Sequence, residues 1–406
     1  MKEFLSLNRT IKIRVFMQFI GALCFSTVGS SMTIYYNQHL GAGITGFLLI
    51  ASSVVSFAIG LWSGHLSDVR GRRPLMLFST LITAAGGFLA AFSNSALLFN
   101  PWLTYVGFLV ISFGYGFFGT AASAMLVDVT NADNRKFVYS IQYWVINVSI
   151  LLGSALSGWF FRDYLFFLLL AVALEELLSF ALVFFFIEES FDPQKNAHKV
   201  EKNLVKSYFS VVKDRTFMLY CFGSVFIAMI FNQMDYYLPV HLSDSFNSTA
   251  IFGIPIYGQR MLTIFLMINT LIIVFFMNFF NRLTKNWSRQ TGISVGIILQ
   301  GSGFALAFLG HNLTTEIIAA LVATIGEMIL VPSSQAFRAD LMEGEQVGTY
   351  SGAFSITQPL ANVLCGLLVS GSGIYGNIGM AIIMIVIIVL GAYPAVRSVN
   401  RYEKLA

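Results

Sequence analysis

Four acidic side chains fall inside long apolar stretches of this chain. They are Glu327, Asp235 and the adjacent pair Glu175 and Glu176. A carboxylate in apolar surroundings is costly unless it is paired, protonated or faces a water-filled cavity. A carboxyl group in such a place can take up a proton from one side and release it to the other, and as an anion it attracts cationic ligands. These acids are therefore our first candidates for functional residues.

The composition shows what surrounds these acids. Of the 406 residues, 56% are hydrophobic and 11% are charged, and the mean hydropathy is +0.75. Average proteins carry about 25% charged residues, so the chain is predicted to be a membrane protein with many spans. A helical span needs about 20 apolar residues, and the chain has room for about twelve of them.

Twelve apolar runs form two sets of six. We predict helices, because each run is longer than a tilted barrel strand and lacks strict polar alternation. The first set covers residues 13–36, 44–67, 74–95, 101–127, 137–160 and 165–187, and the second covers 216–239, 258–280, 291–311, 315–337, 348–371 and 374–396. The predicted fold class is therefore an all-α membrane protein with twelve transmembrane helices in two pseudo-symmetric six-helix bundles. Its parts are an N-terminal half (1–187), a charged central link (188–215) and a C-terminal half (216–406).

The lysines and arginines indicate the orientation of these helices. All but two of the 24 basic residues fall on one side of the predicted spans, and the exceptions are Arg162 and Arg260. In this count Arg14 is grouped with the basic residues of the N-terminal arm. The positive-inside rule then predicts a multi-pass plasma membrane protein with both termini and the link in the cytoplasm. The net charge of +4 follows from this topology, so no nucleic-acid partner is expected.

An internal repeat relates the two halves. Gly114 and Asp128, at the two ends of one segment, recur with the same spacing as Gly326 and Asp340. The fourth predicted helix therefore corresponds to the tenth. Two similar halves are typical of transporters whose substrate site lies between repeats near the bilayer midplane.

The turn between the second and third predicted helices, residues 64–73, is short, basic and rich in glycine. Gly64 and Gly71 permit a sharp turn, and Asp68 can cap a neighbouring helix N-terminus. Arg72 and Arg73 can bridge to acids or lipid phosphates; alternatively, they only hold the turn on the inner side of the membrane.

This turn, Gly-His-Leu-Ser-Asp-Val-Arg-Gly-Arg-Arg, resembles the cytoplasmic signature of the major facilitator superfamily, and the likeness in layout covers nearly the whole chain. Residues 31–38 and 258–263 further resemble the multidrug/proton antiporters of the drug exporter branch. The resemblance implies proton-coupled multidrug efflux of lipophilic or cationic compounds by alternating access. The implied partners are small lipophilic substrates, protons and membrane lipids; enzyme activity and cofactors are not implied.

The resemblance also implies roles for residues. Helices 1, 4, 7 and 10 line the cavity in this superfamily, which favours Glu327 and Asp235 for proton and substrate coupling. Glu327 could instead form a structural hydrogen bond to another helix, and Asp235 could pair with Arg260. Glu175 and Glu176 are expected not to share one cavity, because adjacent residues point about 100° apart around a helix.

Two further groups of residues are predicted from the turn, the repeat and the aromatic side chains. The chain holds 40 Phe, 16 Tyr and 15 Met, which suit a greasy and adaptable cavity. The predicted substrate cavity includes Gln142, Tyr143, Trp144, Tyr236, Tyr237 and Arg260. The predicted gating signature consists of Gly64, Asp68, Gly71, Arg72, Arg73, Asp128 and Asp340.

Two alternatives to drug export are a carrier for one metabolite or lipid and an enzyme or receptor scaffold. A carrier for a defined metabolite or lipid, such as a sugar symporter or lysolipid flippase, would share the fold but would place more polar side chains inward. An enzyme or receptor scaffold has little support, because no phosphate-binding loop, metal-spaced histidine pair or catalytic triad stands out. Cys24, Cys221 and Cys365 lie in apolar runs and are expected to be buried thiols.

Overall fold

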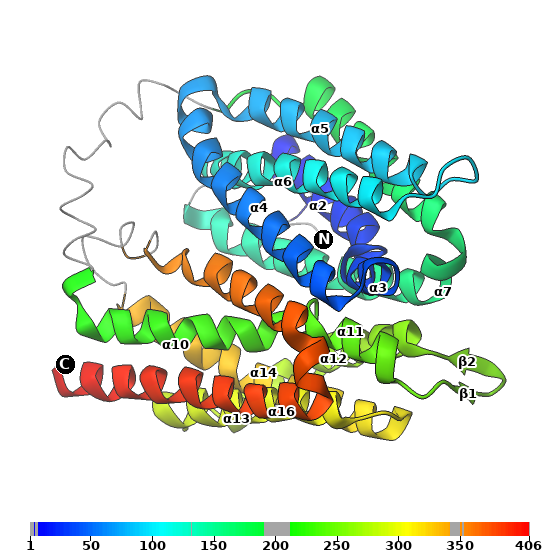
Figure 1. The fold of residues 1–406 in the computed structure, drawn as a ribbon. Coiled ribbons are helices and arrows are strands. Elements are labelled where there is room, and N and C mark those ends of the chain that lie inside the picture. The colour runs from blue at the N-terminus through cyan, green and yellow to red at the C-terminus, as the bar shows by residue number, and fades with distance from the viewer. Residues whose placement is uncertain are drawn as a thin grey trace. The chain divides into compact units, whose positions relative to one another are not determined.

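The computed structural model describes residues 4, 7–130, 132–190, 212–341, 350 and 353–405. It consists almost entirely of helices (Figure 1). The chain divides into two compact units: Met1–Met32 with Ala51–Val200, and Thr33–Ile50 with Glu201–Ala406. We call them the N-terminal and C-terminal units. The predicted boundary at residues 188–215 stays a prediction, because most of that link lies outside the described residues.

Two helices of the N-terminal part begin at side-chain caps. The Asn8 side chain accepts a hydrogen bond from Thr10 N–H at the start of the first long helix. Asn100 accepts from Trp102 N–H and Leu103 N–H, and Pro101 follows at the first helical position, as expected for a helix start. The helices are α2 (Arg9–Ser26), α3 (Gly29–Leu40), α4 (Ala42–Arg70), α5 (Arg72–Phe92), α6 (Pro101–Val129) and α7 (Ala132–Phe186).

Similar caps start helices in the C-terminal part. Asp214 accepts from Thr216 N–H and Phe217 N–H, and the Ser288 hydroxyl accepts from Thr291 N–H. The elements are α10 (Arg215–Asn232), α11 (Tyr237–Ser245), β1 (Thr249–Ile251), β2 (Ile254–Ile256), α12 (Gly258–Leu283), α13 (Arg289–Leu309), α14 (Leu313–Leu341) and α16 (Thr357–Leu405). The strands form an antiparallel hairpin, which the sequence analysis did not predict.

Ten helical segments of the described chain are long and apolar enough to cross a membrane. Two of them, with 50 and 48 residues, contain a non-helical residue, Tyr164 in α7 and Gly376 in α16. At 1.5 Å per residue each would measure roughly 70–75 Å, about twice the hydrocarbon thickness of a bilayer. Each therefore has the length of two passes with a sharp turn between them, which is consistent with the predicted twelve helices.

Several predicted helix boundaries were wrong. The first predicted helix, 13–36, begins earlier, at Arg9, and is interrupted after Ser26. The predicted helix 216–239 is interrupted at residues 233–236, between α10 and α11. Hydropathy locates an apolar run but not a break inside it, because a few turn residues, even polar ones such as Gln233 and Asp235, change the average over a whole span very little.

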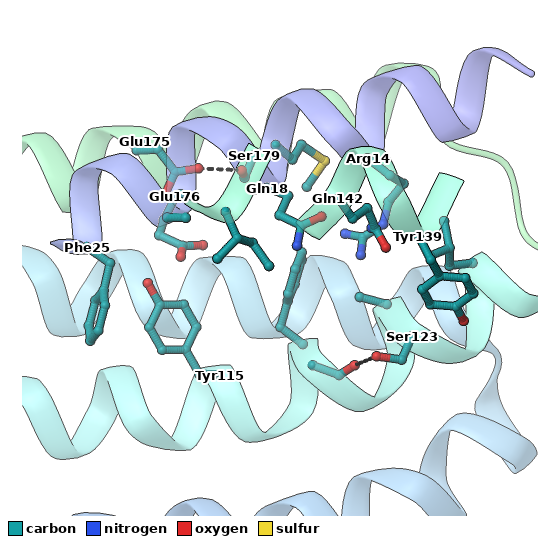
Figure 2. Close-up of a pocket in the computed structure, with 18 residues that line it drawn as sticks. Arg14, Gln18, Phe25, Tyr115, Ser123, Tyr139, Gln142, Glu175, Glu176 and Ser179 are labelled. Atoms are coloured by element: carbon teal, nitrogen blue, oxygen red, sulfur yellow. Dashed lines mark hydrogen bonds between the residues drawn. The ribbon is translucent and has the colours of Figure 1, made fainter. Parts of the chain in front are cut away.

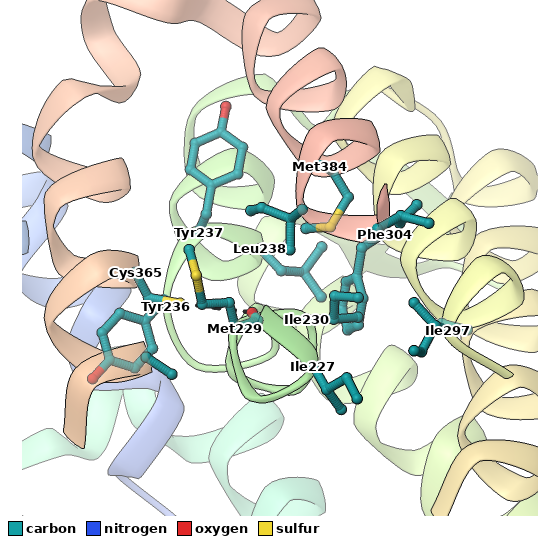
Figure 3. Packing of buried hydrophobic residues seen from close by; sticks show 14 of the residues in the cluster. Ile227, Met229, Ile230, Tyr236, Tyr237, Leu238, Ile297, Phe304, Cys365 and Met384 are labelled. Atoms are coloured by element: carbon teal, nitrogen blue, oxygen red, sulfur yellow. Dashed lines mark hydrogen bonds between the residues drawn. The ribbon is translucent and has the colours of Figure 1, made fainter. Parts of the chain in front are cut away.

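The C-terminal unit has an extensive hydrophobic core. It joins α10, α11, α12, α13, α14 and α16, and Figure 3 shows Ile230, Leu238, Phe304 and Met384 meeting there. Phe265 and Phe304 stack with their ring centroids 6.0 Å apart. Burial of apolar side chains on all six helices holds this unit together.

Candidate functional site

A cavity of about 540 Å³ lies inside the N-terminal unit, between α2, α6 and both halves of α7 (Figure 2). Apolar and aromatic side chains form most of its wall, and a few polar groups converge on it, as in many ligand sites. The polar and aromatic side chains that line it are Arg14, Gln18, Phe25, Tyr115, Phe118, Ser123, Tyr139, Gln142, Glu175, Glu176 and Ser179.

Glu175 and Glu176 both line this cavity, which corrects the expectation that they could not share one. Both are buried, with exposed fractions of 6% and 5%. The Ser179 hydroxyl donates a hydrogen bond to Glu175 Oε1 at 2.7 Å, and the Tyr115 hydroxyl points toward Glu176 (Figure 2). The two carboxyl groups leave the helix in different directions, but the cavity is wide enough to receive both.

Arg14 was placed wrongly in the sequence analysis, which counted it with the N-terminal arm. It lies in the second turn of α2, is 6% exposed and lines the same cavity as the two acids. Its guanidinium carbon lies 5.1 Å from the centroid of the Phe118 ring, a cation–π contact. The signal that could have found it is Asn8, a capping residue that marks the helix start before Arg14.

Glu327, a predicted coupling residue, lies in the middle of α14 and is half-buried. Its Oε2 accepts a hydrogen bond of 2.8 Å from Asn269 of α12, and the Asn269 amide also reaches the Thr324 hydroxyl at 3.3 Å. The repeat spacing makes Glu327 the counterpart of Tyr115 in the N-terminal unit. Asp235, the other predicted coupling residue, is exposed in the turn between α10 and α11.

The predicted gating turn connects α4 and α5 through Gly71, whose φ is +94°. Arg72, the first residue of α5, reaches back to the Ser67 carbonyl at 2.6 Å and pairs with Asp128 at 3.3 Å. Glu189, which follows α7, accepts hydrogen bonds from the backbone N–H groups of Arg72 and Arg73, both at 3.0 Å. Glu189 thus neutralises the positive end of α5, a role that the sequence analysis gave to Asp68.

Arg73 and Asp68 belong to the same predicted gating turn, but only the side chain of Arg73 is described. Arg73 donates to the Phe184 carbonyl at 2.7 Å and lies beside the Phe184 ring. The side chains of Gly64, His65 and Asp68 lie outside the described part of the structure, so the cap predicted for Asp68 remains a prediction.

The C-terminal unit repeats the ion pair of this turn. Arg289, the first residue of α13, pairs with Asp340 near the end of α14 at 2.7 Å. Asp340 is the repeat counterpart of Asp128, and each aspartate is the next-to-last residue of its helix. In the N-terminal unit, the arginine that starts α5 therefore binds an aspartate near the end of α6. In the C-terminal unit, the arginine that starts α13 binds an aspartate near the end of α14.

The residues predicted for the substrate cavity do not gather in one described cavity. Gln142 lines the cavity of the N-terminal unit, whereas Trp144 is 61% exposed and is not among its lining residues. The side chain of Tyr143 lies outside the described part. Tyr236 and Tyr237 are buried in the core of the C-terminal unit. Arg260 donates to the Pro255 carbonyl at 2.6 Å, beside the hairpin.

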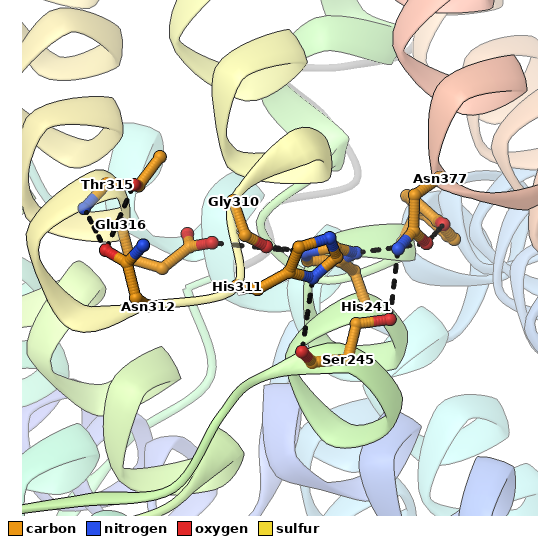
Figure 4. A network of polar contacts seen from close by, with 9 residues as sticks. His241, Ser245, Gly310, His311, Asn312, Thr315, Glu316 and Asn377 are labelled. Carbon is orange, nitrogen blue, oxygen red and sulfur yellow. Dashed lines mark hydrogen bonds and ion pairs between the residues drawn. The ribbon is translucent and has the colours of Figure 1, made fainter.

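A second polar cluster in the C-terminal unit joins residues of α11, α14 and α16 with Gly310, which follows α13 (Figure 4). The two ring nitrogens of His241 face the Gly310 carbonyl at 2.7 Å and the Asn377 side-chain oxygen at 3.3 Å. Glu316 is fully buried, and its Oε1 lies 3.9 Å from His241. The sequence analysis did not single out Glu316, because it sits at the edge of an apolar run.

The helical fold, its many apolar spans and its internal cavity are those expected of a multi-pass membrane transport protein. The family described as Major Facilitator Superfamily matches residues 15–364. The chain belongs to this superfamily.

Known transport and resistance proteins resemble this chain over most of its length. A Na(+), Li(+), K(+)/H(+) antiporter of Planococcus maritimus is 25% identical, over 98% of this chain and 97% of the relative. The tetracycline resistance protein, class H, of Pasteurella multocida is 23% identical, over 91% of each chain. Among solved structures, a POT family transporter in complex with a thioalcohol-conjugated peptide superposes with a TM-score of 0.74 at 14% identity, covering 96% of this chain and 97% of that one. At this identity the structural likeness shows the fold alone.

Proposed function

We propose that this chain is a secondary active transporter that exports lipophilic or cationic compounds in exchange for protons by alternating access. The observation that carries the proposal is the cavity of the N-terminal unit, where two buried acids meet an aromatic and apolar wall. Relatives named for tetracycline resistance and for cation/proton exchange support the same class of activity.

The acid pair has a direct role in this proposal. Two carboxylates in one cavity repel each other, so a single proton or a single cationic group placed between them lowers the energy. A cationic substrate and a proton therefore compete for Glu175 and Glu176, which is the requirement for exchange. Ser179 fixes the orientation of Glu175 through its hydrogen bond.

Glu327 is proposed as a second proton-binding group. Its hydrogen bond to Asn269 joins α14 to α12, so a change in its charge alters a contact between two helices. Asp235 keeps its predicted coupling role only as part of this proposal, since it lies in an exposed turn.

Transport in liposomes tests the proposal. The purified protein is reconstituted, a pH gradient is imposed, and the movement of a fluorescent lipophilic cation is followed. We expect gradient-driven movement in the parent protein and at least a tenfold slower rate in Glu176→Gln and Glu327→Gln. Glu403→Gln, which changes an exposed acid near the C-terminus, is the matched control and should transport normally. Dye movement that does not depend on the gradient would exclude proton exchange.

A second candidate is the exchange of alkali-metal cations for protons. It is favoured by the relative named as a Na(+), Li(+), K(+)/H(+) antiporter, which matches nearly the full length of the chain. The same liposomes, loaded with a pH-sensitive dye and exposed to a sodium or potassium gradient, distinguish the two. Proton flux driven by the metal ion without an organic cation supports this second candidate.

A further inference from the structure

Arg14 is a buried cationic side chain that lines the cavity of the N-terminal unit. It is more than nine-tenths buried, and its Nε has no hydrogen-bond partner in the part of the chain that the structure describes. The side-chain oxygen of Gln18, one turn further along α2, is likewise without a partner there. A buried guanidinium is expensive unless an anion or several acceptors bind it. The Phe118 ring offers a weak attraction but cannot replace a charge-assisted hydrogen bond.

The acids occupy the other end of the same cavity, as Figure 2 shows. Glu175 of α7 lies beside Gly21 of α2, because a Cβ at Gly21 would be 3.5 Å from Glu175 Oε1. Seven residues separate Arg14 from Gly21, which corresponds to about 10 Å along the helix axis. One cavity thus carries a cationic end and an acidic end about two helical turns apart, with Gln18 between them.

We propose that this cavity binds zwitterionic amphiphiles, molecules that carry an amine and a carboxylate at opposite ends of an apolar body. The amine lies at Glu175 and Glu176, and the carboxylate accepts hydrogen bonds from the Arg14 guanidinium, whose planar geometry matches a carboxylate. The apolar body contacts the ring of Phe118 and its neighbours. This inference rests on the proposed transport function and narrows its substrate class from lipophilic cations to compounds with both charges.

The charges of the cavity favour this class. A simple lipophilic amine satisfies the acids but leaves Arg14 without an anion, and a simple fatty acid satisfies Arg14 but not the acids. A zwitterion satisfies both ends at once. Gln142 lies beside Arg14 in the cavity (Figure 2) and is neutral, so it leaves the guanidinium charge available to a ligand.

Binding of three matched probes to the purified protein in nanodiscs tests the proposal. The probes are 8-aminooctanoic acid, octylamine and octanoic acid, which share one chain length and differ only in their charged ends. We expect 8-aminooctanoic acid to bind about 10- to 100-fold more tightly than either of the others, the factor that one charge-assisted hydrogen-bonded contact supplies. Equal binding of the zwitterion and the amine would overturn the proposal.

Two variants separate the role of Arg14 from folding. Arg14→Gln should reduce the affinity for 8-aminooctanoic acid to that for octylamine and leave octylamine binding unchanged. Gln142→Glu keeps Arg14 but supplies an internal carboxylate beside it, and should remove the same preference even if Arg14→Gln does not fold. A zwitterion preference that survives in Gln142→Glu contradicts the proposed contact. Failure of the zwitterion preference with gradient-driven dye transport intact would reject this inference and leave the proposed function standing.

Discussion

Gly71 is the residue on which the geometry of the predicted gating turn depends most directly. Its φ of +94° belongs to the left-handed region, where a side chain costs about 1–2 kcal/mol. A Cβ at this position would also collide with the Glu189 carboxylate, which caps the first N–H groups of α5. We expect Gly71→Ala to lower the free energy of unfolding by about 1–3 kcal/mol, as measured by chemical unfolding in mixed micelles.

Gly60 provides the matched control for this substitution. It lies inside α4, and a Cβ there would meet no atom of another residue within 4 Å. Replacing a helical glycine by alanine favours the helix by up to about 1 kcal/mol, so Gly60→Ala should unfold no earlier than the parent protein. An equal loss of stability in both variants would mean that φ and the Glu189 contact are not responsible.

Residue by residue, the sequence identified four acids of the spans, missed Glu316, and did not show how the acids are grouped. Glu175 and Glu176 were recognised, yet their common cavity was not expected, because helix geometry gives directions around an axis and not the width of the space beside it. Arg14 was missed because its charge suggested a loop, whereas the cap at Asn8 begins the helix before it. Neighbouring helices decide which polar groups meet, and one sequence does not contain that information directly.

At the scale of elements, the ion pair between α5 and α6 can be compared with the ion pair between α13 and α14, because the two differ in burial. Arg72 is buried, with 6% of its side chain exposed, whereas 42% of the Arg289 side chain is exposed. Water compensates the loss of a partner at Arg289 far better than at Arg72. We expect Asp128→Asn to destabilise the protein by about 1–3 kcal/mol and Asp340→Asn by less than about 1 kcal/mol.

The same two variants address the proposed gate. If the pairs hold one conformation of each unit, Asp128→Asn should slow transport while equilibrium binding of a lipophilic cation stays nearly unchanged. Rate measurements in liposomes and binding measurements in nanodiscs together check this. Equal stability losses in the two variants would contradict the argument from burial, and lost binding would place Asp128 in the substrate site.

The turn inside α16 gives a further prediction at this scale. Gly376 has φ +60° and ψ −179°, a combination that is essentially restricted to glycine. Gly376→Ala should therefore lower the free energy of unfolding by about 1–3 kcal/mol, whereas Gly373→Ala, which has open space at its Cβ and no positive φ, should not. Thermal unfolding followed by circular dichroism compares them. Similar unfolding of both variants would show that the chain reverses without this backbone conformation.

Most elements were predictable from apolar runs, and the exceptions have a common cause. The break after Ser26 carries no charged residue or proline, and the break at residues 233–236 contains a single charged residue, Asp235, which was itself predicted to lie within a helix. The hairpin of β1 and β2 follows α11 in a segment that had been treated as a connection. Hydropathy averages over a window, so it predicts that a segment crosses the membrane but not where its backbone bends.

At the scale of the whole molecule, the double length of α7 and α16 and the distribution of charge together predict one membrane topology. An even number of passes places both termini on the same side, and the positive-inside rule predicts that this side is the cytoplasm. The connection between α5 and α6 then lies outside, and the connection between α12 and α13 lies inside. Leu97 is 88% exposed in the first connection, and Lys285 is exposed in the second.

Cysteine labelling from each side of the membrane tests this topology. In a background with Cys24, Cys221 and Cys365 replaced by alanine, Leu97→Cys should react with a membrane-impermeant maleimide in intact cells. Lys285→Cys should react only after the membrane is made permeable, because its turn is predicted to face the cytoplasm. The reverse pattern would invert the predicted orientation. Labelling of both positions from outside would require an even number of passes between them, and α7 could then not cross the membrane twice.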